Sequence, residues 1–209
     1  MTVLIVDDHM VVREGLRGIV LKSENHAVVD MANNGKEALE LMEKCAYDLV
    51  ILDISMPGLS GLEVLETMKR NNMGGHILVL SMHPQAQYAV RALRLGASGY
   101  LSKETAYQEL ATAIKRISAG GRYVSTDLAE SYIFDTKGAS EKAPHERLSE
   151  REFQIMCMIA QGKTPTEISK EISISVKTVS THRSRILQKM GMKKSLDLML
   201  YAIHNGLIE

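Results

Sequence analysis

The sequence predicts an α/β domain built on a doubly wound parallel sheet, followed by a second, all-α domain. Three observations predict this division. Residues 1–121 alternate short apolar runs with longer amphipathic stretches, the order typical of β-α-β units. From Leu148 onward the pattern is helical only. A length of 209 residues also suits two domains of about 100 residues each.

Five apolar runs are the expected strands of the first domain. They are continuous rather than alternating, which is typical of parallel strands covered by helices on both faces. The runs are residues 3–6, 27–31, 49–52, 77–80 and 99–101. The helices expected after them are residues 11–21, 36–43, 62–70, 85–95 and 107–118. This strict alternation assigns residues 1–121 to one doubly wound domain.

Residues 122–146 are expected to form a linker, because the stretch from Lys137 to Pro144 is polar and has no apolar face to bury. An apolar pattern at residues 128–134 predicts one short helix within this linker. Residues 147–209 are expected to hold four short helices in a helix-turn-helix arrangement. The residues expected to cap them are Ser149 with Glu152, Thr164 with Glu167, Ser175, and Ser195.

The charge of the chain differs between its two parts. The net charge is zero, yet the segment from His145 to Glu209 holds ten basic and seven acidic residues and carries +3, which leaves −3 on the rest. A basic second domain is compatible with nucleic acid as its partner. No run of about 18 apolar residues and no signal peptide is present, so we expect a cytoplasmic protein without a membrane partner. Cys45 and Cys157 are expected to be buried thiols.

Polar residues close four of the expected strands. They are Asp7 and Asp8 after the first, Asp53 after the third, Ser81 after the fourth, and Lys103 after the fifth. Ligands of doubly wound sheets bind at the carboxyl ends of the strands, so these side chains should converge. Three crowded carboxylates need a cation, and Mg²⁺ prefers oxygen ligands. One carboxylate would remain as a nucleophile for aspartyl-phosphate chemistry, with Lys103 and Ser81 countering the phosphoryl charge.

These residues resemble the receiver domain of two-component response regulators. The resemblance rests on the acidic pair, Asp53 followed by Ile-Ser-Met-Pro-Gly-Leu-Ser-Gly, Ser81, and Lys103 with Tyr100 three residues before it. It implies a sheet order of 2-1-3-4-5 and phosphorylation of Asp53 by a sensor histidine kinase. It also implies a Mg²⁺ (or Mn²⁺) site formed by Asp7, Asp8, Asp53 and the Ser55 carbonyl. In this family Ser81 moves to the phosphoryl group and Tyr100 swings inward, while His83 tunes the lifetime of the phosphorylated state.

The third helix of the second domain is expected to enter the major groove of DNA. Its apolar positions Val179, Ile186 and Met190 should face the core together with Ile168 and Ile172. The opposite, polar face is suited to base edges and phosphates. Ser180, Thr181 and Ser184 are assigned to bases, and Lys177, Arg183, Arg185 and Lys189 to phosphates. Thr178 and Gln188 complete the expected DNA-binding set, while His182 is expected to be structural.

The second domain resembles the LuxR/GerE type of helix-turn-helix, and the two domains together resemble the NarL/FixJ class of regulators. The residues that carry this are Leu148 to Glu152, Gly162 with Lys163, Glu167 with Ile168, Ser175 to Val179, His182, Ile186 and Lys189 with Met190. The resemblance implies a transcription regulator that binds double-stranded promoter DNA, with RNA polymerase as a further partner. On the fourth helix, Leu196, Met199, Leu200 and Ile203 share one side, and some of them must pack inward. Those left exposed would form a homodimer contact on activation.

Two alternatives remain open at this point. The first is a DNA-binding regulator that works without phosphate and uses the receiver only as a dimerisation scaffold. The second is an enzyme, a phosphotransferase or phosphatase with Asp53 as its nucleophile. The second lacks another acid two residues after Asp53, where Ser55 stands. We therefore expect no enzyme activity beyond the phosphorylation and dephosphorylation of the receiver itself.

Overall fold

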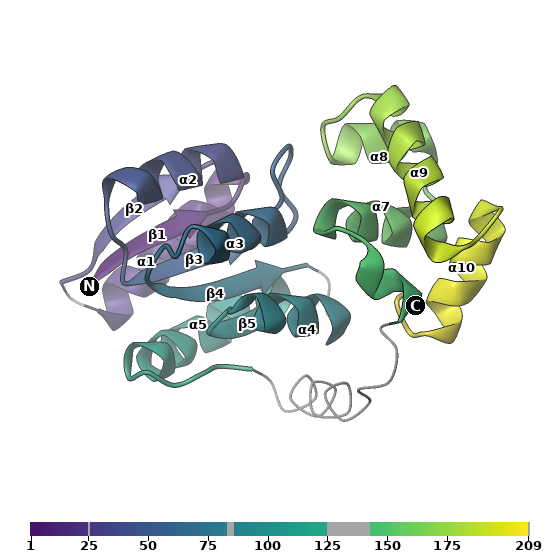
Figure 1. Ribbon diagram of the computed structural model, residues 1–209. Coiled ribbons are helices and arrows are strands. Elements are labelled where there is room, and N and C mark those ends of the chain that lie inside the picture. Colours follow the sequence, from purple (N-terminus) through teal and green to yellow (C-terminus); the bar gives the residue numbers. More distant parts are fainter. Residues whose placement is uncertain (25, 83–85, 125–142, 209) are drawn as a thin grey trace. The chain divides into compact units, whose positions relative to one another are not determined.

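The computed structural model describes residues 1–24, 26–82, 86–124 and 143–208, which form two compact units divided within residues 125–142 (Figure 1). The short helix expected at residues 128–134, and His83, lie outside the described residues. Among the described residues, none of the helices has the length and apolar character needed to span a bilayer.

The N-terminal unit is built on a five-stranded parallel sheet in the order β2-β1-β3-β4-β5, which confirms the predicted topology. Its strands are β1 (Thr2–Val6), β2 (Val28–Ala32), β3 (Leu49–Asp53), β4 (His76–Ser81) and β5 (Gly99–Ser102). Its helices are α1 (Met10–Ser23), α2 (Gly35–Lys44), α3 (Gly61–Arg70), α4 (Ala86–Leu95) and α5 (Lys103–Ser118).

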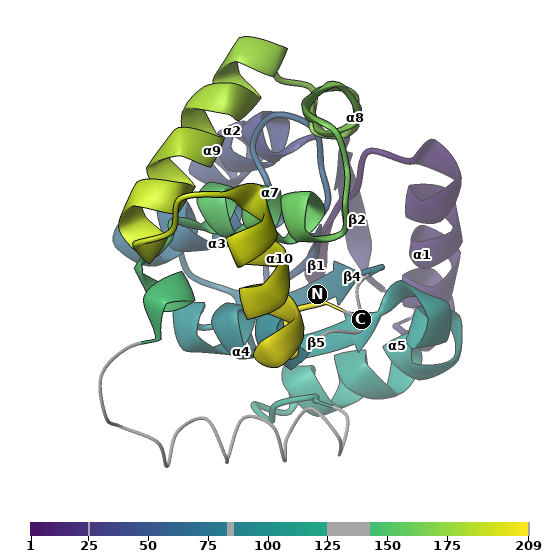
Figure 2. The same ribbon diagram turned by 90° about the vertical axis from the view of Figure 1, so that its right-hand side faces the viewer.

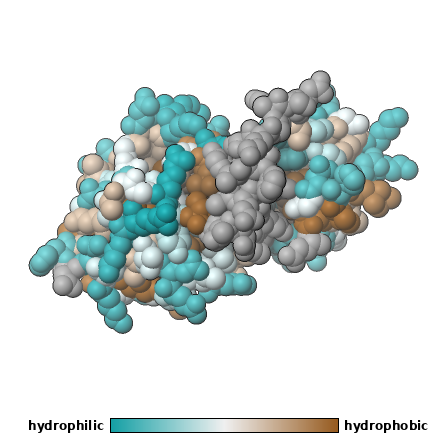
Figure 3. Space-filling model, turned by 90° about the horizontal axis from the view of Figure 1, so that it is seen from below, coloured by the Kyte–Doolittle hydropathy of each residue, from teal (hydrophilic) through white to brown (hydrophobic). Residues whose placement is uncertain are grey.

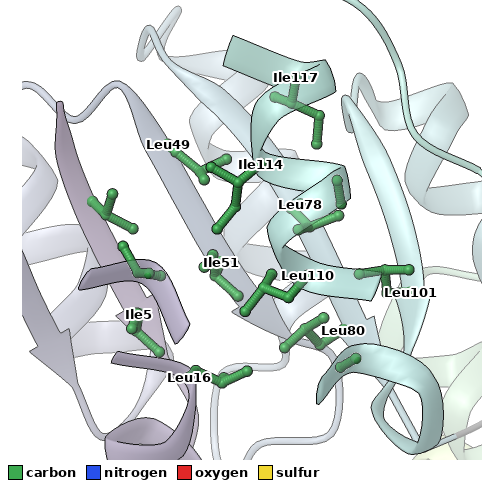
Figure 4. Packing of buried hydrophobic residues seen from close by; sticks show 14 residues of the cluster. Ile5, Leu16, Leu49, Ile51, Leu78, Leu80, Leu101, Leu110, Ile114 and Ile117 are labelled. Carbon is green, nitrogen blue, oxygen red and sulfur yellow. The ribbon is translucent and has the colours of Figure 1, made fainter. Parts of the chain in front are cut away.

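Helices cover both faces of this sheet. Helices α1 and α5 pack together on one face, while α2, α3 and α4 form a row on the other (Figures 1 and 2). Between the sheet and the α1/α5 layer, aliphatic side chains such as Ile51, Leu80 and Leu110 pack together in one hydrophobic core (Figure 4). The expected covering on both faces holds for β3, of which every residue is buried. Strand β2, at one edge of the sheet, differs, with Val28 60% exposed.

Helix α5 begins at Lys103, four residues before the expected start at Tyr107. The cause is a cap: the Ser102 hydroxyl accepts a hydrogen bond from the backbone N–H of Glu104 at 3.2 Å. The unit also continues past the expected boundary at residue 121. Tyr123 pairs with the outer edge of β5, where its carbonyl accepts from the Tyr100 N–H at 2.9 Å and its own N–H donates to the Ser98 carbonyl at 3.0 Å.

The C-terminal unit is all helical. It consists of η1 (Pro144–Arg147), α7 (Glu150–Ala160), α8 (Pro165–Glu171), α9 (Val176–Met190) and α10 (Ser195–His204). The short helix η1 lies within the expected linker, but it belongs to this unit because His145 Nδ1 lies 2.8 Å from the Tyr201 hydroxyl of α10. The linker expected over residues 122–146 is therefore shorter at both ends.

Local caps set most of the helix starts in this unit. The capping boxes of Ser149 with Glu152 and of Thr164 with Glu167 are both formed, and Ser175 caps α9, as predicted. Ser195 was expected to cap α10 and does not, because the Asp197 carboxylate accepts from the Lys194 N–H at 2.8 Å and makes Lys194 the cap.

The two cysteines differ in burial. Cys157 is buried within α7, as expected, whereas the prediction that Cys45 is buried was wrong. Cys45 is the C-terminal cap of α2, where the chain leaves the helix at the surface.

Candidate functional site

Acidic and basic side chains meet at the carboxyl ends of the parallel strands. Asp7 follows β1, Asp53 ends β3, and Lys103 begins α5 directly after β5. The Lys103 Nζ lies 2.7 Å from Oδ2 of Asp7 and 2.7 Å from Oδ2 of Asp53. Both aspartates are buried, with 0% and 1% of their surface exposed. Residues far apart in the sequence thus converge as the sheet topology predicts. We call Asp7, Asp8, Asp53 and Lys103 the acidic pocket.

Burial and charge oppose one another in the acidic pocket. Burial raises the pKa of Asp53, and the nearby charge of Lys103 offsets only part of that effect. For Lys103 burial alone would lower the pKa, but the attraction of Asp53 and Asp7 outweighs it, so the pKa is raised. Lys103 therefore remains a cation that is shared by two carboxylates. Charged groups held in this way can counter negative charge brought to Asp53 by a ligand.

The residues after β1 form a second part of the site. One ligand atom each from Asp7, Asp8 and His9 lie within 4.8 Å of one another. The Nδ1 atom of His9 contacts Oδ1 of Asp8 at 2.9 Å and Oδ1 of Asp7 at 3.3 Å. On α1, Arg13 donates from Nη1 to the Asp7 carbonyl at 2.6 Å. His9 and Arg13 were absent from the predicted site, although His9 directly follows the acidic pair.

The loop after β3 folds back over Asp53. The Ser55 N–H donates to Asp53 Oδ1 at 3.1 Å, and the buried Ser55 hydroxyl has no hydrogen-bond partner within the described part of the chain. Gly61 begins α3 against the backbone of Asp53, where a Cβ atom would lie 2.0 Å from the Asp53 carbonyl oxygen. Glycine at this position allows the loop to close over the carboxylate.

Ser81 ends β4, and Tyr100 lies within the neighbouring strand β5, opposite Val79. Both are buried, with 0% and 1% of their surface exposed, and their hydroxyls form a hydrogen bond. Burial raises the pKa of the Tyr100 hydroxyl, even though the hydrogen bond from Ser81 lowers it. Tyr100 thus occupies the interior as a neutral phenol.

All nine residues predicted to bind DNA are exposed on the C-terminal unit: Lys177, Thr178, Ser180, Thr181, Arg183, Ser184, Arg185, Gln188 and Lys189. The opposite side of α9 is apolar, and Val179, Ile186 and Met190 are buried there, as are Ile168 and Ile172. The core side of the helix is therefore confirmed. Three hydroxyls on the exposed side donate to the carbonyl four residues earlier, at 3.0 to 3.1 Å: Ser180, Thr181 and Ser184.

The basic side chains of α9 differ in their contacts. Lys177 and Arg185 form no ion pair with any described residue. Arg183 donates from Nε to the Ser195 hydroxyl at 2.8 Å. Lys189 points toward α7, where its Nζ lies 2.6 Å from Oε2 of Glu152. An expected phosphate ligand is thus engaged by a buried carboxylate, which no pattern within α9 could have shown.

Helix α10 leaves apolar side chains uncovered. Leu196, Leu200 and Ile203 are 59%, 60% and 55% exposed. Met199 is the fourth apolar residue expected on this side of α10, and it is partly buried. The expectation that some of the four pack inward therefore holds for Met199 alone, and only in part. The residues of α10 that are fully buried are Leu198 and Ala202. Apolar surface on the C-terminal unit is visible in Figure 3.

Comparisons with known proteins agree with these two units. The response regulator receiver domain family matches residues 3–115, and the luxR family of bacterial regulatory proteins matches residues 146–202. Response regulator UvrY of Escherichia coli K12 is 36% identical over 98% of this chain and 94% of its own length. Response regulator GacA of Pseudomonas aeruginosa is 33% identical over 99% of this chain and 97% of its own length.

A solved structure extends the similarity to three dimensions. It is RcsB from Salmonella enterica serovar Typhimurium, bound to promoter rprA in the presence of phosphomimetic BeF3⁻. The TM-score is 0.62 at 26% sequence identity, and the match covers 96% of this chain and 98% of that chain. The chain therefore belongs to the two-component response regulators of the NarL/FixJ class, in which a receiver domain precedes a LuxR-type DNA-binding domain.

Proposed function

We propose that a sensor histidine kinase phosphorylates Asp53 in the cytoplasm, and that this modification controls promoter binding by α9. The observation that carries the proposal is the contact of Lys103 Nζ with both Asp53 and Asp7 at 2.7 Å. Asp53 is the carboxylate on which this cation and the folded-back loop converge, so it is the one suited to act as nucleophile. Lys103 then pairs with a phosphoryl oxygen in place of Asp53.

The carboxylates beside Asp53 fit a hard divalent cation. Asp7, Asp8 and the Ser55 carbonyl, together with Asp53, would hold Mg²⁺ (or Mn²⁺). This donor set is supported by the clustered carboxylate oxygens, since one ligand atom from each of Asp7, Asp8 and His9 lies within 4.8 Å of the other two. The metal would neutralise charge on the phosphoryl oxygens. With these groups in place, the receiver itself would catalyse the transfer of the phosphoryl group from the kinase to Asp53 and its later hydrolysis.

Ser81 and Tyr100 would couple the phosphoryl group to the rest of the receiver. Their hydroxyls form one hydrogen-bonded pair, so a Ser81 side chain that turns toward a phosphoryl oxygen must leave Tyr100. A change in the position of either side chain would therefore change the hydrogen bonding of the other. Phosphorylation would shift the population of receiver conformations through this pair.

In the DNA-binding domain, Ser180, Thr181 and Ser184 would contact bases, flanked by Thr178 and Gln188. Lys177, Arg183 and Arg185 would contact phosphates. Support comes from their exposure on one side of α9 and from the promoter-bound structure of the similar RcsB. Two copies of the chain would meet through α10 on a two-fold related site, where RNA polymerase is the further partner.

The first test is phosphorylation of the full chain by acetyl phosphate and Mg²⁺. Wild type should gain one phosphoryl group by intact mass, and Asp53→Ala should gain none. Asp30→Ala is the matched control, because Asp30 is an aspartate of the same sheet on its exposed edge strand, and it should behave as wild type. Incorporation into Asp53→Ala would contradict the assignment of the acceptor.

A second candidate function is a regulator that binds DNA without phosphate. The exposure of the polar side chains of α9 on the DNA-binding domain is compatible with it. The two candidates differ in one measurement, the affinity for duplex DNA before and after treatment with acetyl phosphate. We expect an increase for wild type and none for Asp53→Ala. Equal, tight binding by all forms would rule out gating and support the second candidate.

A further inference from the structure

The first turn of α7 contains two adjacent charged residues that are almost fully buried. Arg151 is 7% exposed and Glu152 is 4% exposed. Charged residues are rarely buried unless they are paired, so each should have a structural partner. Both side chains reach other helices of the DNA-binding domain.

Arg151 holds the turn that precedes α9. Its Nη2 donates to the Ile172 carbonyl at 2.8 Å, and its Nη1 donates to Gln154 at 2.7 Å. Ile172 is the last residue before the turn, and the next residue, Ser173, has a φ of +51°. Residues other than glycine adopt this backbone conformation with difficulty. The Ile172 carbonyl would otherwise be a free acceptor at the end of α8. Arg151 therefore stabilises the strained turn that sets the start of α9.

Glu152 holds the other end of α9. One oxygen, Oε2, accepts from the Ser149 N–H at 2.8 Å and from Lys189 Nζ at 2.6 Å. Lys189 lies in the last turn of α9, one residue before its end at Met190. The same carboxylate thus caps α7 and fixes the end of α9. Ion pairs that share a buried carboxylate with a helix cap are more strongly held than exposed ones.

We propose that Arg151 and Glu152 are positioning residues for DNA binding: they fix the two ends of α9, and Lys189 serves as the anchor of Glu152 rather than as a phosphate ligand. This inference rests on the proposed role of α9 as the DNA-contacting helix. Lys177 and Arg185, which form no ion pair with any described residue, then supply phosphate contacts. Lys177 and Lys189 should therefore contribute differently to the salt dependence of DNA binding.

The test measures DNA binding by the full, acetyl-phosphate-treated chain over a range of salt concentrations. The probe is a fluorescent duplex selected by the wild-type chain from a random-sequence pool. A lysine that contacts a phosphate contributes to the slope of log affinity against log salt, and its loss reduces that slope by about one. Lys177→Met should show this reduction. Lys189→Met should weaken binding about tenfold with the slope unchanged, because it shifts the helix without removing a phosphate contact.

Glu152→Gln is a second test, because the two possible roles of Lys189, anchor or phosphate ligand, predict opposite changes in the affinity for DNA. Glutamine retains an acceptor for the Ser149 N–H, so the cap of α7 survives. If Lys189 is an anchor, this variant should bind DNA as weakly as Lys189→Met, and the double variant should be no weaker than either single one. If Lys189 is a phosphate ligand, Glu152→Gln frees it, and affinity should rise. Melting temperatures of the variants establish that each one is folded.

Four outcomes overturn the proposal. A smaller salt slope for Lys189→Met, or tighter binding by Glu152→Gln, would make Lys189 a phosphate ligand and remove the positioning role alone. Unchanged binding by Arg151→Met, in a variant that remains folded, would exclude control of the turn by Arg151. Unchanged affinity and slope for Lys177→Met would remove α9 as the DNA-contacting helix, and the positioning role with it.

Discussion

At the scale of single residues, the acidic pocket depends on one ammonium group that serves two buried carboxylates. Lys103→Met leaves Asp7 and Asp53 without a counter-charge. Removing one partner of a buried ion pair costs about 3 to 5 kcal/mol, so we expect the free energy of unfolding of the receiver to fall by about that amount. Denaturant titration in metal-free buffer measures it. Adding Mg²⁺ should restore more stability to Lys103→Met than to wild type, since a cation replaces the lost charge.

The matched control for this prediction is Lys36→Met. Lys36 pairs with Glu40 at 3.7 Å on the surface, and both side chains are largely exposed. Such pairs contribute about 0 to 1 kcal/mol, so this variant should unfold almost as wild type does. Equal stability of Lys36→Met and Lys103→Met would show that the buried contacts of Lys103 contribute little.

Glu152 makes the stability of the DNA-binding domain depend on pH. Burial tends to raise the pKa of this carboxyl, but the hydrogen bonds from Lys189 and Ser149 outweigh it and lower the pKa. A carboxyl whose pKa is lower in the folded state stabilises the fold above its unfolded pKa of about 4.3 and loses that effect as pH falls through the folded pKa. We expect Lys189→Met to flatten the fall in melting temperature below about pH 4.3. A fall as steep as that of wild type would contradict this.

At the scale of elements, β5 requires glycine where the chain returns after α5. A Cβ atom on Gly99 would lie 2.7 Å from the Tyr123 carbonyl oxygen and 2.9 Å from a methyl group of Leu78. Gly99→Ala should therefore destabilise the receiver by about 1 to 3 kcal/mol, because the neighbours must move. In the interior of α1, Gly18 has open space, so Gly18→Ala should instead stabilise it by about 0.5 to 1 kcal/mol. Thermal unfolding of both variants compares the two; destabilisation by Gly18→Ala would contradict the reasoning.

Element boundaries could be predicted from the sequence where the signal is local. Ser149 with Glu152 lies within one helical turn, so the sequence alone shows the cap and the start of α7. Ser195 was assigned wrongly because its hydroxyl instead accepts from Arg183, twelve positions away, while Asp197 caps α10. The receiver site could be predicted for a different reason: parallel strands bring their closing residues to one edge whatever their separation in sequence.

The contacts that escaped prediction join separate elements without a periodic pattern. Lys189 and Glu152 are 37 positions apart, and nothing in the spacing of α9 indicates which of its basic residues turns inward. The same holds for Tyr123, whose partners are the backbone of Ser98 and Tyr100 and the Glu109 carboxylate of α5, none of which is indicated by the residues around it. Side-chain direction between helices is set by packing, and packing is not visible in a single sequence.

At the scale of the whole molecule, neutrality conceals two domains of opposite charge. The DNA-binding segment carries +3 and the receiver side −3. Long-range attraction to DNA therefore comes from one domain, while the acidic domain is repelled by phosphates. The salt dependence of DNA binding should consequently be carried by the basic domain.

The apolar side chains on α10 indicate how two copies of the chain would assemble. Leu196, Leu200 and Ile203 lie at helical spacing and are 55% to 60% exposed. Stable interfaces use about 20 or more residues on each side, and three side chains fall far short of that. We therefore expect dimers on DNA, where two adjacent half-sites hold the protomers together, and monomers of the isolated DNA-binding domain in free solution.

Leu200→Glu tests this mode of assembly, because it places two like charges against one another in a two-fold contact. The phosphorylated full chain carrying this change should bind a duplex with one copy per site where wild type binds two, and its phosphorylation should be unaffected. Val28→Glu is the matched control: Val28 is equally exposed, at 60%, but lies on β2 of the receiver. Sedimentation velocity with labelled duplex counts the bound copies. Two copies of Leu200→Glu on the duplex would exclude α10 as the contact, and one copy of Val28→Glu would move the contact to the receiver.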